Sequence, residues 1–185
     1  MKFRREAGVA VAAGPVVVVE VLGNGLASDT HIGPLANARR LAAMDMLVKD
    51  AADRGAEIVT GGARVGNRGY FFQPTILAGV PEDALAMTSE PFGPVALVSS
   101  FADLDEAIAK ANRNPVGLAG YAFTNSHAAA MKVREELEVG VLGINSFAVS
   151  QTEAPFGGVK ESGYGYEGGA EALDSYLHRK YVHHA

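Results

Sequence analysis

Two stretches of the sequence carry the side chains best suited to binding a polar ligand or transferring a proton. In residues 89–95 (SEPFGPV) a carboxylate, Glu90, stands two positions before an aromatic ring, Phe92. Residues 153–167 (EAPFGGVKESGYGYE) combine several glycines with four charged side chains. An ionised carboxylate accepts hydrogen bonds from hydroxyl groups, and a carboxylic acid can take up or release a proton. On residue type alone, Glu90 is more simply an exposed loop carboxylate and Phe92 a core aromatic.

The second stretch is predicted to be a long ordered loop. Glycine inside a helix or strand costs about 0.5–1 kcal/mol relative to alanine, so residues 153–167 are unsuited to either. Long ordered loops inside compact domains usually carry function. Composition alone leaves a flexible surface loop as an equal alternative.

The same stretches resemble the aldehyde dehydrogenase superfamily. Residues 155–167 match its carboxy-terminal signature P-F-G-G-x-K-x-S-G-x-G-x-E, and residues 90–94 are similar to its E-x-F-G-P segment. Further similar segments follow the family's order: IGPL at 32–35, GYFFQPT at 69–75, GLA at 117–119 and GIN at 143–145. The resemblance runs from about Val21 to Val182 and looks closest to succinate-semialdehyde dehydrogenases.

The resemblance implies a cofactor contact in the first loop. Glu90 is expected to accept hydrogen bonds from the nicotinamide ribose of NAD or NADP, and Phe92 to pack beside the nicotinamide ring. The 185-residue chain alone is expected to bind neither cofactor, because the family's dinucleotide-binding domain is expected to precede Met1. No residue here distinguishes NAD from NADP.

Five residues are expected on the substrate side, also by resemblance. Asn145 and Phe156 would line the aldehyde pocket, and Ser150 and Gln151 would shape substrate choice. Two neutral hydrogen-bonding side chains suit an aldehyde that bears a carboxylate, such as succinate semialdehyde. Glu167 would belong to a proton relay. The alternatives stay open: Asn145 as a strand-end amide that satisfies loop backbone, Ser150 and Gln151 as solvated loop residues, and Phe156 as a loop anchor.

Composition narrows the function classes. The chain has 185 residues, a net charge of −5 and no cysteine. The absence of cysteine excludes disulfides, thiolate metal sites and the nucleophile that aldehyde dehydrogenases use. No basic stripe suggests nucleic acid, and no apolar run is long enough to cross a membrane. We therefore expect a cytoplasmic chain without a metal site that is inactive by itself.

The elements that must position these residues alternate between helix and strand, which predicts an α/β fold with a parallel-type sheet and helices on its faces. Asp103 and Ser126 are expected to cap helices, and Gly140 to end the second of these. In the expected helix 34–54, apolar residues recur at helical spacing and should form one buried face: Leu41, Met44, Leu47 or Val48, and Ala51. The expected strands are 16–19, 57–60, 71–77 (at an edge or bulge, because of Pro74), 94–101, 118–124, 141–145 and 176–183; the expected helices are 34–54, 103–112, one from 126, and 169–174.

The predicted organisation has three parts. Residues 1–20 form a leader unlike the family, residues 21–168 a partial catalytic domain, and residues 169–185 a helix followed by a protruding oligomerisation strand. The resemblance implies a carboxy-terminal portion of an enzyme that oxidises an aldehyde to the acid. The alternative is a non-catalytic assembly or binding module. In either case the expected partner is another copy of the chain or a full-length aldehyde dehydrogenase subunit.

Overall fold

A computed structural model describes residues 10–12 and 21–185, which divide into two compact units. Unit 1 comprises Met1–Pro15 and Phe101–Ala185, and unit 2 comprises Val16–Ser100. The predicted strand at 16–19 lies outside the described residues.

Unit 2 is built on helix α1 (Ala38–Asp53). The Asn37 side chain caps it by accepting a hydrogen bond from the Arg40 amide at 3.1 Å, so the helix begins after the predicted start at Pro34. The apolar face predicted from helical spacing is confirmed, because its members are buried: Leu41, Met44, Leu47, Val48 and Ala51.

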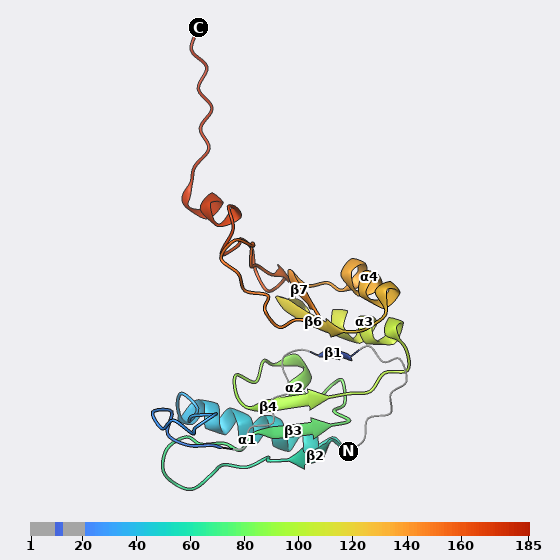
Figure 1. Cartoon of the computed structure of the whole chain (residues 1–185). Helices are drawn as coiled ribbons and strands as arrows, with labels where there is room; N and C mark the ends of the chain where they lie inside the picture. Colours follow the sequence, from blue (N-terminus) through green and yellow to red (C-terminus); the bar gives the residue numbers. More distant parts are fainter. Residues whose placement is uncertain (1–9, 13–20) are drawn as a thin grey trace. The chain divides into compact units, whose positions relative to one another are not determined.

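The sheet of unit 2 has the strand order β2-β3-β4 (Figure 1). Its strands are β2 (Glu57–Thr60), β3 (Thr75–Ala78) and β4 (Val95–Val98). Strand β3 pairs antiparallel with β2 and parallel with β4, and the short helix α2 (Leu85–Thr88) lies on the crossover. Residues 71–77 were expected at an edge or a bulge. The edge position is wrong, because β3 is central; the β2–β3 ladder does shift register, between Ile58 and Thr60 on β2. Pro74 stands just before β3, where it removes no ladder donor.

Unit 1 holds the second sheet, of order β1-β6-β7. Its strands are β1 (Ala10–Ala12), β6 (Ala119–Phe123) and β7 (Val141–Ile144), with β6 parallel to β7 and antiparallel to β1. Helices α3 (Leu104–Asn112) and α4 (His127–Glu136) begin at the predicted caps Asp103 and Ser126. Their buried residues meet the sheet in a small core of Ile108, Ala122, Val133 and Leu137.

The parallel-type sheet is confirmed only in part. Among the strands of the described residues, the parallel pairs are β3–β4 and β6–β7, whose crossovers contain α2 and α4, and an isolated parallel bridge joins Leu22 to Ile32. The other pairs are antiparallel, including the small ladder of β5 (Val116–Gly117) with β8 (Val159–Lys160). The structure is therefore a mixed α/β arrangement with several small sheets.

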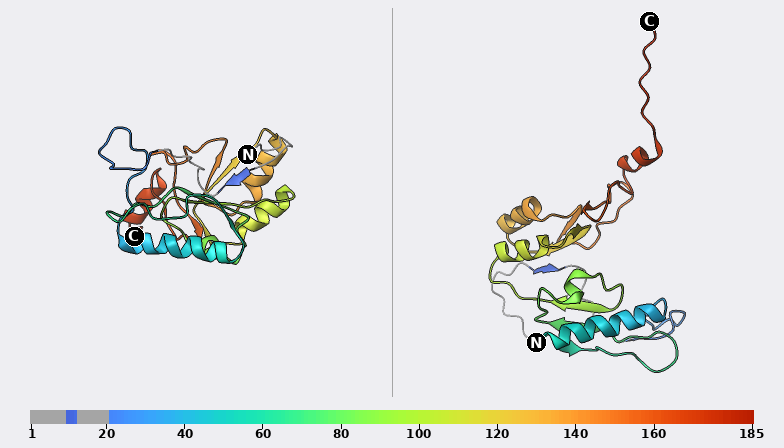
Figure 2. Two further views of the ribbon diagram at one scale, coloured as in Figure 1. Left: turned by 90° about the horizontal axis from the view of Figure 1, so that it is seen from below. Right: turned by 180° about the vertical axis from the view of Figure 1, so that it is seen from behind.

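The predicted carboxy-terminal elements need correction. The last helical turn is a 3₁₀-helix, η1 (Glu171–Tyr176), which starts two residues later than the expected helix and takes in Tyr176. Residues 177–185 form no strand with any described residue, and they run away from η1 in extended form (Figures 1 and 2). A strand needs a ladder partner, and these residues have none within the described chain.

Candidate functional site

Residues 89–94, which we call the Glu90 loop, lie in unit 2 between α2 and β4. Both predicted cofactor residues face solvent: Glu90 is exposed, and Phe92 is 67% exposed. Glu90 forms no hydrogen bond or ion pair with the described residues, as expected of a carboxylate available to a ligand. Phe92 has a φ of 44°, which is unusual for a residue with a bulky side chain.

Close packing on α1 fixes this backbone. A Cβ on Gly93 would overlap Met44 Sδ and lie 3.2 Å from Met44 Cγ, so a larger residue here would require the Met44 side chain to move. The Pro94 carbonyl accepts a hydrogen bond from the Thr75 amide at 2.8 Å. The loop is thus held at one end, while its aromatic ring stays outside the core. Backbone strain of this kind, about 1–3 kcal/mol, is often found at ligand sites.

Helix α1 also fixes the entry to the loop. Asp50 accepts a hydrogen bond from the Leu85 amide at 2.7 Å and so caps α2, whose last residue is two positions before Glu90. Arg54 bridges Asp50 and Asp83 at 2.9 and 2.7 Å. The Leu85 amide first, and then Arg54, lower the pKa of Asp50.

Asn145, at the end of β7, uses its side chain within the protein. Its Oδ1 accepts from the Thr124 amide and its Nδ2 donates to the Thr124 carbonyl, both at 2.9 Å. Its φ of 55° turns the chain at this point. The arrangement joins the ends of β6 and β7, so the alternative of a strand-end amide describes Asn145 directly; a contact with substrate stays a prediction.

The structure brings Phe156 and Glu167 together through backbone. The Phe156 amide donates to the Glu167 carbonyl at 2.7 Å, and the Glu167 amide donates to the Phe156 carbonyl at 2.8 Å. Phe156 is half-buried and Glu167 is exposed, without a side-chain partner among the described residues. The glycine-rich stretch is therefore an ordered loop closed across its base, as predicted.

Ser150 and Gln151 lie on an exposed segment just before this loop. Gln151 makes one long hydrogen bond, from Nε2 to the Ala148 carbonyl at 3.5 Å, and Ser150 makes none within the described chain. Both side chains are accessible to a ligand, and their predicted part in substrate choice stays a prediction.

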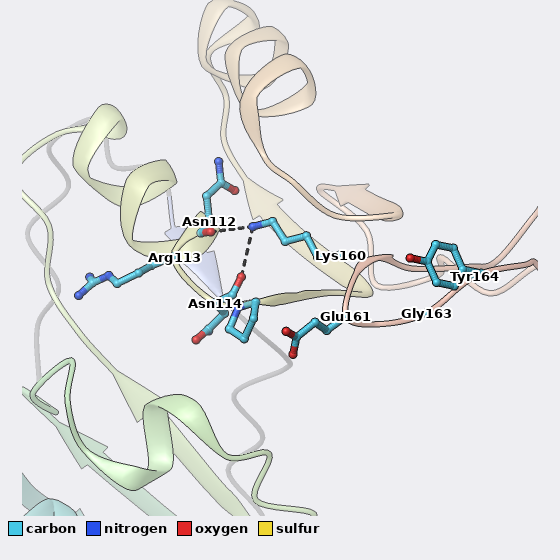
Figure 3. Close-up of a pocket in the computed structure, with 8 residues that line it drawn as sticks. Asn112, Arg113, Asn114, Lys160, Glu161, Gly163 and Tyr164 are labelled. Atoms are coloured by element: carbon cyan, nitrogen blue, oxygen red, sulfur yellow. Dashed lines mark hydrogen bonds between the residues drawn. The ribbon is translucent and has the colours of Figure 1, made fainter.

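Sequence reasoning missed Lys160, inside the same loop. Its ammonium donates to the carbonyls of Asn112 and Asn114 at 2.6 and 3.2 Å (Figure 3). It also pairs with the Glu138 carboxylate. Lys160, Asn112 and Asn114 line an open pocket at the end of α3, together with Arg113, Glu161 and Tyr164. The lysine in the matched signature was the available signal, but residue type did not reveal that its partners are distant carbonyls.

The predicted residues fall in both units: Glu90 and Phe92 in unit 2, the five substrate-side residues in unit 1. Among the described residues, no group of three or more histidine, aspartate or glutamate side chains could hold a metal ion. None of the described helices is long and apolar enough to cross a membrane.

Comparison with known proteins gives one consistent family. The model of the aldehyde dehydrogenase family matches residues 15–182. The chain is 51% identical over 163 residues to 4-(hydroxymethyl)benzenesulfonate dehydrogenase TsaD1 of Comamonas testosteroni, covering 88% of the chain and 34% of that protein. It is 47% identical over 161 residues to rat mitochondrial succinate-semialdehyde dehydrogenase, covering 87% of the chain and 31% of that enzyme.

Solved structures that resemble the chain belong to the same family. Succinate-semialdehyde dehydrogenase from Burkholderia pseudomallei matches with a TM-score of 0.81 and 39% identity, over 84% of the chain and 32% of that structure. A betaine aldehyde dehydrogenase variant from Staphylococcus aureus, in complex with NAD+, matches with a TM-score of 0.82 and 36% identity, over 86% of the chain and 33% of that structure. The chain spans about a third of the length of the curated relatives it matches.

Proposed function

Because the chain belongs to the aldehyde dehydrogenase family, we propose that it forms the part of an NAD(P)-dependent enzyme that holds the nicotinamide end of the cofactor and one wall of the aldehyde pocket. The observation that carries this proposal is the Glu90 loop. A strained backbone, packed on Met44, presents one exposed aromatic ring and one uncommitted carboxylate to solvent.

These two side chains fit a nicotinamide riboside. The Glu90 carboxylate can accept hydrogen bonds from two sugar hydroxyls, and the face of Phe92 can pack on a flat ring. When bound, NAD(P) supplies the hydride acceptor for aldehyde oxidation. The chain's own contribution is to bind and orient the nicotinamide end and to shield it from water with Phe92.

The proposed substrate is an aldehyde that carries an anionic group, with succinate semialdehyde as the first candidate. Two relatives support this class, because their names refer to a benzenesulfonate and a succinate semialdehyde. The exposed Ser150 and Gln151 can donate hydrogen bonds to an anionic group. Asn145 and Phe156 would form the neighbouring wall, and Glu167 would belong to a proton relay towards the active site.

Aldehyde oxidation of this family's kind needs a thiolate to form the adduct from which hydride leaves. The 185 residues contain no cysteine. We therefore propose that the nucleophile lies outside these residues and that the chain acts only together with it.

A chimera tests the proposal. Residues 21–182 would replace the matching third of rat succinate-semialdehyde dehydrogenase, and NAD(P)H formation would be followed with succinate semialdehyde. We expect activity, with Glu90→Ala raising the KM for the cofactor and Ser150→Ala with Gln151→Ala raising the KM for the aldehyde. Leu26→Ala, at an exposed position far in sequence from both loops, serves as the control. A folded chimera with neither activity nor cofactor binding would reject the proposal.

A second candidate is a non-catalytic assembly module. It is favoured by residues 177–185, which expose Leu177, Tyr181 and Val182 without a ladder partner among the described residues. Such a segment can add as a strand to another chain. Mixing the chain with the full-length rat enzyme and measuring co-sedimentation separates the two: a stable mixed complex that leaves the rat enzyme's activity unchanged favours assembly.

A further inference from the structure

Lys160 occupies a backbone position that does not suit lysine. Its φ is 56°, in the left-handed region where glycine and asparagine are favoured. Glycine tolerates a positive φ, so a glycine at this position would relieve the backbone strain. The side chain is also only 25% exposed, which is low for a lysine. Something must therefore hold this residue in place.

The Lys160 backbone pairs with Val116 in the β5–β8 ladder, and the ammonium group adds a second hold. A lysine ammonium has three protons to donate, and each has an acceptor here: the carbonyls of Asn112 and Asn114, at 2.6 and 3.2 Å, and the carboxylate of Glu138. Two of these three acceptors are backbone carbonyls. The contact is thus more than an exposed ion pair, which on average contributes little to stability.

The acceptors belong to the ordered frame of unit 1. Asn112 is the last residue of α3, and Glu138 lies on the connection from α4 to β7. The Asn112 side chain ties these two segments together, since it donates to the Glu136 carbonyl at 2.7 Å and accepts from the Glu138 amide at 2.8 Å. Lys160 therefore connects the glycine-rich loop to a junction that is already cross-linked.

Glu161 and Ser162, which follow Lys160, form hydrogen bonds that also hold the loop in place. The Glu161 amide donates to the Pro115 carbonyl at 2.9 Å, and the Gly117 amide donates to Ser162 Oγ at 2.8 Å. Both bonds join the loop to the segment that contains β5. The paired backbone of Phe156 and Glu167 closes the base of the loop, outside the reach of the ammonium group.

We propose that Lys160 is a positioning residue: by gathering the Asn112 and Asn114 carbonyls and the Glu138 carboxylate, its ammonium holds residues 155–167 in the conformation that pairs Phe156 with Glu167. The value of that pairing for an aldehyde pocket rests on the proposed function. The conformational claim does not, because it is measured on the 185-residue chain without substrate or cofactor.

Hydrogen exchange of the 185-residue chain, resolved to single amides by NMR, tests the proposal. Lys160→Met keeps the length of the side chain and removes its donors. We expect exchange of the Phe156, Glu161 and Glu167 amides to rise by roughly tenfold or more, because hydrogen bonds to charged groups contribute about 1.5–3 kcal/mol. Amides of α1 should be unchanged. Lys49→Met, which removes a lysine with one exposed partner, Asp53, is the matched control and should leave the loop unchanged.

Three further variants separate a carbonyl clamp from a simple ion pair. Lys160→Arg keeps a charged donor and should hold loop exchange within about threefold of the parent. Lys160→Gly relieves the backbone strain, yet should open the loop as Lys160→Met does. The exchange of charges, Lys160→Glu with Glu138→Lys, restores an ion pair but places no donor beside the carbonyls, so it should not restore protection.

The outcomes decide as follows. Loop exchange in Lys160→Gly equal to or slower than in the parent would overturn the proposal, because strain relief alone would then describe the position. Recovery of protection by the charge exchange would overturn it in favour of the ion pair. If Lys160→Met unfolds unit 1, the comparison of Lys160→Arg with Lys160→Gly decides: protection in the first but not in the second supports the proposal, and equal behaviour rejects it.

Discussion

Gly140→Ala should destabilise unit 1 although it adds a single methyl group. Gly140 faces the glycine-rich loop so closely that a Cβ would lie 2.7 Å from the carbonyl carbon of Gly157 and 2.9 Å from the Cα of Gly158, with the Gly157 oxygen closer still. Both neighbours are backbone, so no side chain can rotate away. Overpacking typically costs 1–3 kcal/mol, and we expect about 3 kcal/mol here. For a chain of this size that lowers the Tm by about 6–12 °C.

The assay is thermal unfolding followed by circular dichroism, with Gly25→Ala as the control. Gly25 has no atom within 4 Å of an added Cβ. Its substitution should leave the Tm unchanged or raise it slightly, since alanine lowers the entropy of the unfolded chain. Equal Tm values for the two variants would refute the reasoning, because the close approach of Gly140 to Gly157 would then carry no cost.

Four other outcomes are expected. The purified chain should form no NAD(P)H from succinate semialdehyde with NAD or NADP, as absorbance at the NAD(P)H band would show, because it has no cysteine thiolate. Calorimetry should detect no NAD binding at low micromolar concentration, since Glu90 and Phe92 are proposed to contact only the nicotinamide end. The pKa of Asp50 is lowered in the folded state, so its contribution to the stability of the fold is present above the ordinary aspartate pKa of 3.8 and is lost as the pH falls through the folded value. The stability of Asp50→Asn should therefore depend less on pH below about 4 than that of the parent. Equal pH dependence of the two proteins would contradict the assignment. Sedimentation should show self-association that weakens when residues 176–185 are deleted, and a monomer at all concentrations would argue against an exposed pairing segment.

Local signals in the sequence predicted local structure well. Asp103 and Ser126 cap α3 and α4 as expected, because an N-cap needs only a side-chain oxygen and amides two or three residues away. The apolar spacing of α1 likewise placed its buried face. These features depend on residues within one or two helical turns, and the sequence contains all of them.

Features that depend on distant partners were predicted poorly. Gly140 was expected to end α4, but the helix ends at Glu136, and the glycine instead permits the approach of Gly157. The central position of β3 was also missed, because strand order is set by long-range pairing.

The same distinction separates the residues of the candidate site. A motif resemblance gives equal weight to residues that meet a ligand and residues that keep the motif in shape. The structure divides them by whether their polar atoms already have partners within the protein. The oxygen and the nitrogen of the Asn145 side-chain amide both bond the backbone of Thr124, and all three protons of the Lys160 ammonium have acceptors. The carboxylate of Glu90, by contrast, has no partner among the described residues. Uncommitted polar groups on a fixed backbone can exchange water for a ligand at little cost, so Glu90 is the stronger candidate for direct contact, and Asn145 and Lys160 act first on the protein itself.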